Sequence, residues 1–219
     1  MGTNTMKNVS AKTIGRLSVY RRVLHGLLAE DRQTIFSHEL AVLVAGKAAQ
    51  VRRDVMAVGY TGSTTRGYDV RELMRSIGRF LDAPDGQGMA LVGVGLLGRA
   101  VLAYFSGSRL KLSIEATFDI DASKVNRVIQ GCRCYPLKDL SRIIKKSKIS
   151  LGIITVPADQ AQGVAEKLCR AGVSGLLNFA PVRLQVAPDV HVENVDIITA
   201  FEQAAFFARA RPRKKARGR

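Results

Sequence analysis

The sequence predicts an α/β protein in two parts, a helical domain over residues 1–82 and a parallel-sheet domain over residues 83–208. Three observations support this division. Residues 1–80 carry 13 basic and 6 acidic side chains, whereas residues 81–208 carry 14 and 12. Helical periodicity dominates before the Pro- and Gly-rich segment Asp82–Gly88, and strand-like apolar runs alternate with helical runs after it.

The N-terminal pattern predicts helices over 12–30, 47–58 and 70–81, with a short helix between the first two. Ser37 is expected to cap that short helix, Gly46 to end it, and Gly59 to end the next one. The turn-rich segment GYTGSTTRGYD follows. This order is typical of a winged helix-turn-helix, with a small helical bundle that binds nothing as the alternative.

The basic excess of the chain lies at its two ends. The helical domain has a net charge of +7, and the last eleven residues, RARPRKKARGR, hold seven basic groups and no acid. A basic helical domain followed by a nearly neutral second domain predicts that the helical domain binds a polyanion such as double-stranded DNA. The tail over 209–219 is expected to be disordered, since such charge runs are often solvated ends.

The second domain carries strand-like segments that alternate with helical ones. The expected strands are MALVGV, LSIEATFDI, ISLGIIT, SGLLNF and VHVENV, and the expected helices are LLGRAVLAYF, residues 137–147 and residues 157–171. This alternation predicts βαβ units and a parallel sheet with helices on both faces, as in the Rossmann fold.

A glycine motif, Gly93-x-Gly95-x-x-Gly98, follows the first of these strands and opens a helix, and Asp119 lies 21 positions after Gly98. In a dinucleotide loop the three glycines permit a tight turn, approach of the pyrophosphate and close helix packing. The helix N-terminus attracts the pyrophosphate. Asp119 would accept hydrogen bonds from the adenosine ribose and repel a 2′-phosphate, so we expect NAD(H) rather than NADP(H). A similar sheet that binds another ligand, coenzyme A included, is the alternative.

A catalytic site is not expected. His25 and His38 lie in the helical domain, His191 begins a late strand, and no Tyr-x-x-x-Lys or Cys–His arrangement is present. Hydride transfer to or from a small carbonyl or hydroxyl compound usually needs a positioned acid-base group. The nucleotide site is therefore predicted to bind its ligand without turning it over.

The three cysteines, Cys132, Cys134 and Cys169, are expected to be free thiols. A zinc site is not expected, because no histidine or second pair accompanies Cys132 and Cys134. The sequence has no run of 18 apolar residues, and its first residues lack the apolar core of a signal peptide. A cytoplasmic protein that does not span a membrane is therefore expected.

These motifs resemble those of the Rex family of bacterial redox-sensing transcriptional repressors, from about Val9 to Phe207. The similar stretches are RLSVYRR, AAQVRRDV, RGYDV, GVGLLGRA, FDID, TVPADQAQ, LLNFAPVRL and VENVD. The resemblance implies a homodimer whose winged-helix domains bind a palindromic operator and whose Rossmann domains sense the NADH/NAD+ ratio. NADH would be the preferred ligand and would release the DNA. The last helix, over 197–208, would be exchanged between subunits.

The resemblance also assigns roles to residues of the NAD(H) site. Thr155 and Pro157 would line the cleft, and Asn178 and Ala180 would lie near the nicotinamide. Tyr104 and Asp196 would communicate between nicotinamide and dimer interface, although Tyr104 could simply pack its helix on the sheet. The pyrophosphate would be held by the loop Gly93, Val94, Gly95, Leu96, Leu97 and Gly98, and the adenosine ribose by Asp119.

For DNA, the basic side chains of the helical domain are the candidates. Arg52 and Arg53 would meet the major groove or phosphates, and Gln50 could read an adenine edge. Lys47 would contact a phosphate, Arg16 would reach the operator from the first helix, and Arg66 in the wing could enter a narrow minor groove. A solvated surface charge is the alternative role for each.

The chain departs from the family pattern in three places. Leu96 stands where many members have Asn, the wing over 59–69 is shorter than usual, and the tail from Arg209 is an addition that could serve as a nonspecific DNA arm. Two other functions stay open on the sequence alone. One is an NAD-dependent oxidoreductase with a helical appendage, and the other is a nucleotide- or coenzyme A-binding module without DNA.

Overall fold

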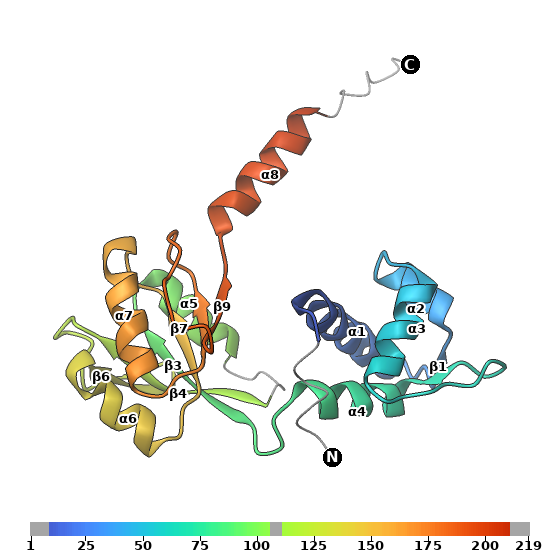
Figure 1. Ribbon diagram of the computed structural model, residues 1–219, viewed down its shortest axis with the longest axis horizontal. Helices are drawn as coiled ribbons and strands as arrows, with labels where there is room; N and C mark the ends of the chain where they lie inside the picture. Colours follow the sequence, from blue (N-terminus) through green and yellow to red (C-terminus); the bar gives the residue numbers. More distant parts are fainter. Residues whose placement is uncertain (1–8, 106–110, 211–219) are drawn as a thin grey trace. The chain divides into compact units, whose positions relative to one another are not determined.

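The computed structural model describes residues 9–105 and 111–210, so most of the predicted basic tail lies outside the described residues. The chain forms two compact units, Met1–Pro84 and Asp85–Arg219. β1 and β2 of the first unit pair antiparallel, and Ser63 and Gly67 form a further bridge in the loop before β2. This arrangement confirms the winged helix-turn-helix. Its elements are α1 (Ala11–Ala29), β1 (Thr34–Ile35), α2 (Ser37–Leu43), α3 (Ala48–Ala57), β2 (Tyr68–Asp69) and α4 (Val70–Leu81) (Figure 1).

The core of the first unit is built from apolar side chains at helical spacing. Leu17 and Leu24 lie seven residues apart on α1 and are fully buried, as are Leu73 and Ile77 on α4. Burying each such side chain stabilises the fold by about 1.5–3 kcal/mol. Asp69 begins α4, and its carboxylate accepts the backbone N–H of Glu72 at 2.8 Å. The packed helices form a rigid support for α3, the helix predicted to enter DNA.

The prediction that Ser37 caps α2 is wrong. Phe36 is the N-cap residue and Ser37 is the first helical residue. The carboxylate of Glu39 accepts the backbone N–H of Phe36 at 2.7 Å, which satisfies one of the free donors at the helix start. A glutamate at the third helical position therefore marks the cap, even though the cap itself has no polar side chain.

The end of α2 also differs from the expectation. The helix ends at Leu43, and the left-handed conformation after it is taken by Ala45, with φ 49°, rather than by Gly46. The N–H of Gly46 donates to the carbonyl of Ala41, as in a Schellman motif. Gly59, with φ 72°, follows α3 as predicted.

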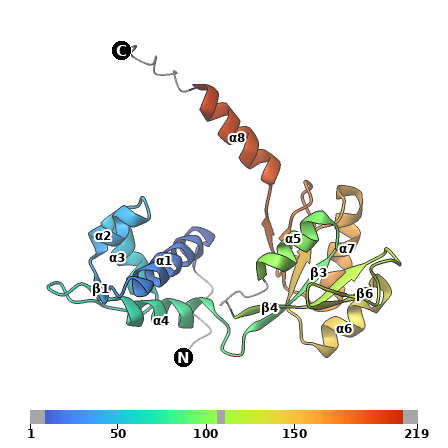
Figure 2. The same cartoon turned by 180° about the vertical axis from the view of Figure 1, so that it is seen from behind.

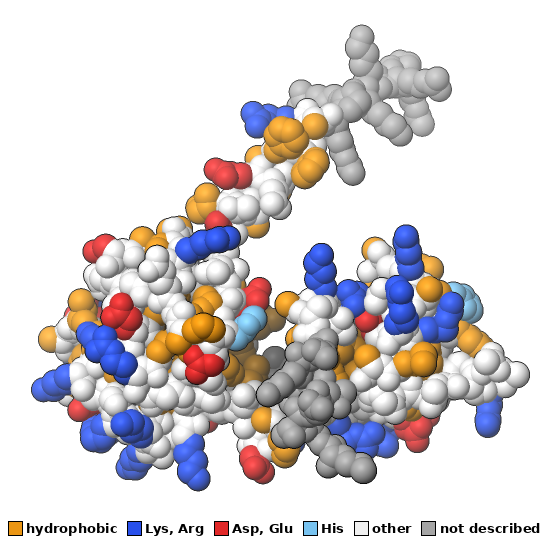
Figure 3. All heavy atoms as spheres, viewed as in Figure 1, with side chains coloured by type: hydrophobic (Ala, Val, Ile, Leu, Met, Phe, Trp, Pro, Cys, Tyr) orange, Lys and Arg blue, Asp and Glu red, His pale blue; other side chains and the backbone are white. Residues whose placement is uncertain are grey.

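Basic side chains are exposed on several elements of the first unit. Figure 3 shows Lys and Arg side chains over α1, α2 and α3. Arg52 and Arg53 are exposed on α3, and Lys47 is exposed at its start. Exposed arginines also lie on α4, at Arg71, Arg75 and Arg79, so the basic excess is spread over the first unit and includes the helix-turn-helix.

The second unit holds a seven-stranded sheet with the order β5-β6-β4-β3-β7-β8-β9. All neighbouring strands are parallel except β5 and β6. From β6 to β9 this is the strand order of the dinucleotide-binding fold. The strands are β3 (Gln87–Val92), β4 (Leu112–Asp119), β5 (Val128–Ile129), β6 (Cys132–Pro136), β7 (Leu151–Ile154), β8 (Gly175–Asn178) and β9 (His191–Asn194). β5 and β6 were not predicted.

Helices cover both faces of the sheet, as expected. The helices are α5 (Leu96–Phe105), the 3-10 turn η2 (Leu137–Asp139), α6 (Leu140–Lys146), α7 (Ala158–Arg170) and α8 (Ile197–Ala210). α6 and α7 lie on one face and α5 on the other (Figure 1, Figure 2). Along β3, Ala90 and Val92 pack with α6 and α7, whereas Met89 and Leu91 pack with α5. Alternation along the strands thus builds one core on each face.

Two further findings concern the helices. Every residue of α8 is exposed, including Phe201, Phe206 and Phe207. Across 9–105 and 111–210, none of the helices has the length and hydropathy that crossing a membrane requires.

Candidate nucleotide and DNA sites

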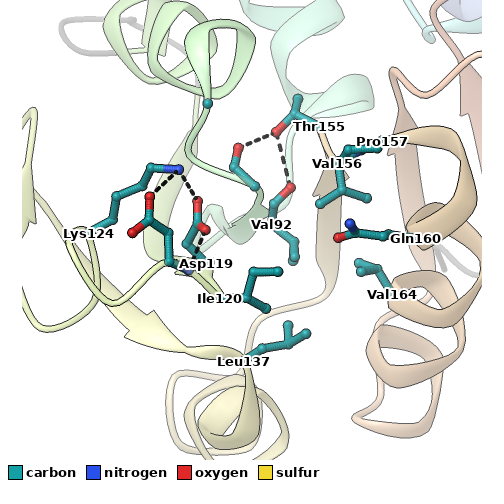
Figure 4. A pocket seen from close by; sticks show the side chains of 13 residues that line it. Val92, Asp119, Ile120, Lys124, Leu137, Thr155, Val156, Pro157, Gln160 and Val164 are labelled. Carbon is teal, nitrogen blue, oxygen red and sulfur yellow. Dashed lines mark hydrogen bonds and ion pairs between the residues drawn. The ribbon is translucent and has the colours of Figure 1, made fainter.

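A cavity of about 290 Å³ opens where β3, β4 and β7 end (Figure 4). The strand order reverses between β3 and β7, and ligands of open α/β sheets bind at such a point. Five residues of the predicted nucleotide site line this cavity: Gly93, Gly95, Asp119, Thr155 and Pro157. The structure therefore brings together residues from three separate strand ends.

Each of the three loop positions requires glycine for a different physical reason. Gly93 has φ 98°, and a Cβ there would lie 2.7 Å from the carbonyl oxygen of Thr155. A Cβ on Gly98 would lie 2.1 Å from the carbonyl oxygen of Gly93. A Cβ on Gly95 would meet nothing within 4 Å. The first and third glycines are thus required by packing, whereas the second leaves open space beside the loop, as a pyrophosphate site needs.

Backbone donors without a partner follow the second glycine. Within 9–105 and 111–210, the backbone N–H groups of Gly95, Leu96 and Leu97 donate to no other group. They belong to the first turn of α5, where helices have unpaired N–H groups and partial positive charge. The Leu96 side chain is 93% exposed and does not line the cavity. The backbone cradle is therefore present although Leu96 replaces the family's Asn.

Thr155 fastens the glycine loop to the end of β7. Its hydroxyl is shared between the carbonyls of Gly93 at 2.7 Å and Val92 at 3.1 Å (Figure 4). Its backbone N–H donates to the carbonyl of Val92 at 2.9 Å. Because these hydrogen bonds join Thr155 to the loop and to the end of β3, Thr155 fixes the position of the loop beside the cavity.

Asp119 lies at the end of β4 with its carboxylate buried. One oxygen accepts the backbone N–H of Val94 at 2.8 Å and the Lys124 ammonium at 3.2 Å, and the other accepts the N–H of Asp121 at 2.9 Å. Burial alone would raise the pKa of Asp119, but these donors outweigh it and hold the pKa below its usual value. Asp119 thus anchors the loop in addition to lining the cavity.

Several cavity residues were missed by the sequence analysis. Apolar side chains line the cavity together with the polar side chains of Asp121, Lys124 and Gln160. Lys124 lies beside Asp119, and Gln160 lies between Val156 and Val164 (Figure 4). The apolar residues are Ile120, Leu137, Val156 and Val164. A signal for two of them was available, because Asp121 and Lys124 follow Asp119 closely and leave the sheet at the same strand end.

The other predicted nucleotide residues lie elsewhere. Val94 is buried in the core on the α5 side of the sheet, and Leu97 on α5 is exposed. The amide of Asn178 is buried and donates to the carbonyls of Ala180 and Val182, so it shapes the turn after β8. Their contact with a nucleotide stays a prediction.

Tyr104 and Asp196 are both exposed. The ring of Tyr104 is 77% exposed, so the alternative that it packs α5 on the sheet is wrong. Asp196 begins α8, where its carboxylate accepts the backbone N–H of Thr199 at 2.9 Å and the Thr199 hydroxyl at 2.6 Å. Tyr104 is therefore free for a contact outside its own unit.

On the first unit, a buried carboxylate joins α1 to α3. Asp54 accepts hydrogen bonds from Arg16 through Nε at 2.6 Å and Nη2 at 2.7 Å, from the Tyr20 hydroxyl at 2.9 Å and from Gln50 Nε2 at 2.9 Å. Burial raises the pKa of a carboxyl, yet these donors hold the pKa of Asp54 below its ordinary value. Burial and the neighbouring carboxylate raise the pKa of Tyr20 to about 12. Two of the predicted DNA residues thus meet inside the unit.

A groove of about 440 Å³ runs between α1 and the turn before α3. Arg16, Lys47 and Gln50 line it together with Lys12, which the sequence analysis did not single out. The clustering of three cations around one groove suits a phosphate group.

The remaining predicted DNA residues lie on α3 and the wing. Arg52 donates to the hydroxyl of Ser37 at 3.2 Å, and Arg53 donates to the amide oxygen of Gln50 at 2.7 Å. Arg66 is exposed in the turn closed by the Ser63–Gly67 bridge. All three present charge at the surface from the elements that winged helices use for DNA.

The three cysteines are free thiols, as predicted. Burial raises the pKa of Cys132 to about 11, so its reactive thiolate is scarce near neutral pH. In the described part of the chain, no group of three or more His, Cys, Asp or Glu side chains could hold a metal ion.

A basic winged-helix unit and a dinucleotide-type cavity in one chain define a ligand-regulated DNA-binding protein. Residues 86–182 match a family described as "CoA binding domain", and residues 8–55 match one described as "Putative DNA-binding protein N-terminus". The redox-sensing transcriptional repressor Rex of Rhodopirellula baltica is 38% identical over 198 residues, covering 90% of this chain and 84% of that protein. The Rex of Limosilactobacillus fermentum is 37% identical, with 92% and 93% covered.

Solved structures agree. RSP, a Rex-family repressor, superposes with a TM-score of 0.82 at 30% identity, covering 92% of this chain and 94% of RSP. RSP in complex with β-NAD+ and operator DNA gives a TM-score of 0.86 at 31% identity, with 92% and 93% covered. The chain belongs to the Rex family of redox-sensing transcriptional repressors. Since these relatives are repressors, the oxidoreductase alternative is wrong, and the match of residues 8–55 opposes a module without DNA.

Proposed function

We propose that the chain represses transcription by binding a palindromic operator through its first unit and releases it when NADH fills the cavity of the second. The observation that carries this proposal is the similarity, over 92% of the chain, to a repressor solved with β-NAD+ and operator DNA together. That protein was solved with a nicotinamide dinucleotide and operator DNA in one complex. We place the DNA-binding domain at residues 1–82 and the NAD(H)-binding domain at residues 83–208. The cytoplasm is the proposed compartment, because it contains both the genome and the NAD pool of a bacterium.

The NAD(H) would lie across the ends of β3, β4 and β7. Its pyrophosphate would accept the free N–H groups of Gly95, Leu96 and Leu97, in the space that a Cβ on Gly95 would otherwise occupy. The adenine would enter the apolar walls formed by Ile120 and Leu137. The nicotinamide would point toward the turn after β8, where Asn178 and Ala180 were predicted to lie near it.

Asp121 is the better placed carboxylate for the adenosine ribose. Both carboxylates have partners within the unit, since Asp121 accepts the backbone N–H and the hydroxyl of Ser123, but the Asp121 side chain is 43% exposed and that of Asp119 is 8% exposed. We therefore propose that Asp119 holds the loop and that Asp121 accepts the ribose hydroxyls. Both negative charges oppose a 2′-phosphate, which favours NAD(H) over NADP(H).

A homodimer accounts for the apolar surface of the second unit. The exposed residues of α8 include Ile198, Phe201 and Phe207, a composition that soluble monomers rarely leave uncovered. Among the described residues, α5 is the one helix over its face of the sheet, and Leu97 and Tyr104 on it are exposed (Figure 1, Figure 2). We propose that α8 crosses to a second copy, so that its apolar side chains are buried there.

On DNA, α3 would enter the major groove. Arg52 and Arg53 would face bases and phosphates, Arg66 would reach from the wing, and Lys12 and Lys47 would bind the phosphate seated at their groove. A dimer would place two such helices on the two halves of a palindrome.

Release by NADH requires a difference in affinity between two states of the dimer. Shifting the population from 1:99 to 99:1 needs a differential of roughly 10⁴-fold, about 5.5 kcal/mol. NADH must therefore bind the DNA-incompetent state that much more tightly, summed over the sites of the dimer.

The test is a selection of duplexes from a random pool with the full chain. Without ligand or with NAD+, a palindrome should be enriched, and with NADH the enrichment should disappear at much lower concentration than with NAD+. Coenzyme A serves as the control ligand, because one matching family is described as a coenzyme A domain. Enrichment that is indifferent to NADH, or that responds to coenzyme A instead, would overturn the proposal.

A further inference from the structure

A chain of hydrogen bonds leads from the inside of the first unit to its surface. It begins at Asp54, which is 2% exposed and accepts from Arg16 and Tyr20 of α1. It continues to Gln50, whose Nε2 donates to Asp54 at 2.9 Å. It ends at Arg53, whose Nη2 donates to Oε1 of Gln50 at 2.7 Å. The three α3 residues lie three and four positions apart and so share one side of the helix.

The buried carboxylate decides which way the Gln50 amide points. An ionised carboxylate only accepts hydrogen bonds, so the NH₂ end of the amide must face Asp54. The carbonyl end is thereby left facing Arg53, and a carbonyl can only accept from a guanidinium. The direction of every bond in this chain therefore follows from the charge of Asp54 and not from the fit of the side chains.

Both ends of Gln50 are occupied in this arrangement. An adenine edge would need the amide to donate and accept along one edge; the amide keeps a second N–H and a second lone pair, but its bonds to Asp54 and to Arg53 hold its orientation. Arg53, in contrast, uses only one of its five N–H groups within the described residues. Its exposed guanidinium keeps the fork that matches the O6 and N7 acceptors of guanine.

We propose that Arg53 reads a guanine in each half-site of the operator, and that Gln50 and Asp54 are positioning residues that aim its guanidinium. This proposal rests on the proposed operator binding and replaces the expectation that Gln50 reads an adenine. Tyr20 and Arg16 hold Asp54 from α1, so the base-reading geometry of α3 is set by a residue network that touches no base.

The experiment measures binding of the full chain to a panel of operators that each carry one base-pair substitution, by fluorescence anisotropy. Gln50→Met keeps the length of the side chain and removes both polar ends. We expect this variant to lose at least about tenfold in discrimination at a single position of each half-site, the one where Arg53→Ala loses discrimination completely. Affinity for a duplex without the operator, and its salt dependence, should stay as in the wild type, because no phosphate contact has changed.

A double variant, Gln50→Met with Arg53→Ala, provides the control. If Gln50 acts through Arg53, the double variant should match Arg53→Ala at that position. Loss of discrimination at a different position would identify Gln50 as a direct reader and overturn the proposal. A uniform loss over all positions together with a lower melting temperature would identify it as a structural residue and also overturn the proposal.

Tyr20→Phe tests the inner end of the chain without touching α3. It removes one donor to Asp54 and leaves the Gln50 bond, so the position read by Arg53 should not change. A wild-type protein that binds no operator at all would count against the proposed function itself and is distinguishable from every outcome above.

Discussion

The backbone N–H of Val94 donates a hydrogen bond to the carboxylate of Asp119 at 2.8 Å, which joins the glycine loop to the end of the neighbouring strand. The same carboxylate accepts the Lys124 ammonium and lines the nucleotide cavity. Loop position and ligand environment are therefore set by one buried group. A single substitution of Asp119 should therefore affect nucleotide binding without affecting DNA binding.

Replacing Asp119 tests this separation. Asp119→Ala should weaken NADH binding by at least about tenfold, because the glycine loop loses the charge-assisted hydrogen bond that anchors it beside the cavity. Operator binding should be retained, giving a repressor that no longer responds to redox state. NADH fluorescence titration and an operator gel shift measure the two effects. Asp119→Asn keeps an acceptor oxygen for Val94, so its NADH affinity should lie between those of the wild type and Asp119→Ala. Loss of operator binding with NADH affinity intact would contradict the division of labour between the units.

The second and third glycines of the loop form a matched pair. Gly95→Ala adds a Cβ in open space, so the melting temperature should hardly change while NADH affinity falls, because the methyl group occupies the pyrophosphate position. Gly98→Ala forces a Cβ to 2.1 Å from the carbonyl of Gly93 and should destabilise the second unit by about 1–3 kcal/mol or more. Calorimetry and NADH titration separate the two. A Gly95→Ala protein that binds NADH normally would place the pyrophosphate elsewhere.

Arg53 on α3 is expected to contribute to operator recognition. Arg53→Ala should remove discrimination at the guanine that Arg53 reads and weaken operator binding by at least about tenfold, while NADH still binds and protects the second unit against heat. Arg53→Lys keeps the charge and loses the planar fork, so nonspecific binding should survive better than specific binding. Anisotropy on operator and on unrelated duplex makes the comparison. An unchanged operator affinity in Arg53→Ala would remove this side chain from the interface.

The ion pair of Asp54 with Arg16 gives the first unit a definite pH dependence. The pKa of Asp54 is lower in the folded chain than the ordinary value of about 3.9, so the carboxylate stabilises the fold above that value. The stabilisation is lost as the pH falls through the folded pKa. Thermal unfolding of the full chain between pH 5 and pH 2.5 should show this loss, and it should be smaller in Asp54→Asn. The same slope in both proteins would mean that other carboxylates account for the acid sensitivity.

α8 should determine the oligomeric state. All its residues are exposed, and Phe201, Phe206 and Phe207 need a partner surface. Phe201→Glu combined with Phe207→Glu should convert a dimer to a monomer, because charged groups cannot be buried unpaired. Sedimentation equilibrium measures the mass, with Glu202→Gln on the same helix as control. A double variant that stays dimeric would move the interface away from α8.

The sequence predicted both units because their signals are local. Leu17 and Leu24 repeat at helical spacing, and the glycine motif sits between a strand and a helix. The hairpin of β5 and β6 was missed because its strands are two and five residues long and its turn uses Gln130 and Gly131, with φ 47° and 80°, instead of the usual Asn-Gly. Pairing of such short strands is decided by the sheet they join.

The nucleotide site could be predicted from the sequence more fully than the network around Asp54. Gly93, Gly95 and Asp119 were found because a motif with fixed spacing marks them. The role of Asp54 was not found, since a charged residue in a helix is normally exposed, and its partner Arg16 lies 38 residues earlier in the chain. Contacts of that kind follow from helix packing and leave no periodic trace.

The central claim is that the nucleotide and operator sites are thermodynamically coupled, and its most direct test is the NADH affinity of the full chain with and without saturating operator. Because coupling is reciprocal, operator DNA should weaken NADH binding by the same factor by which NADH weakens operator binding, while NAD+ affinity changes far less. An NADH dissociation constant that is the same with and without operator would contradict the account.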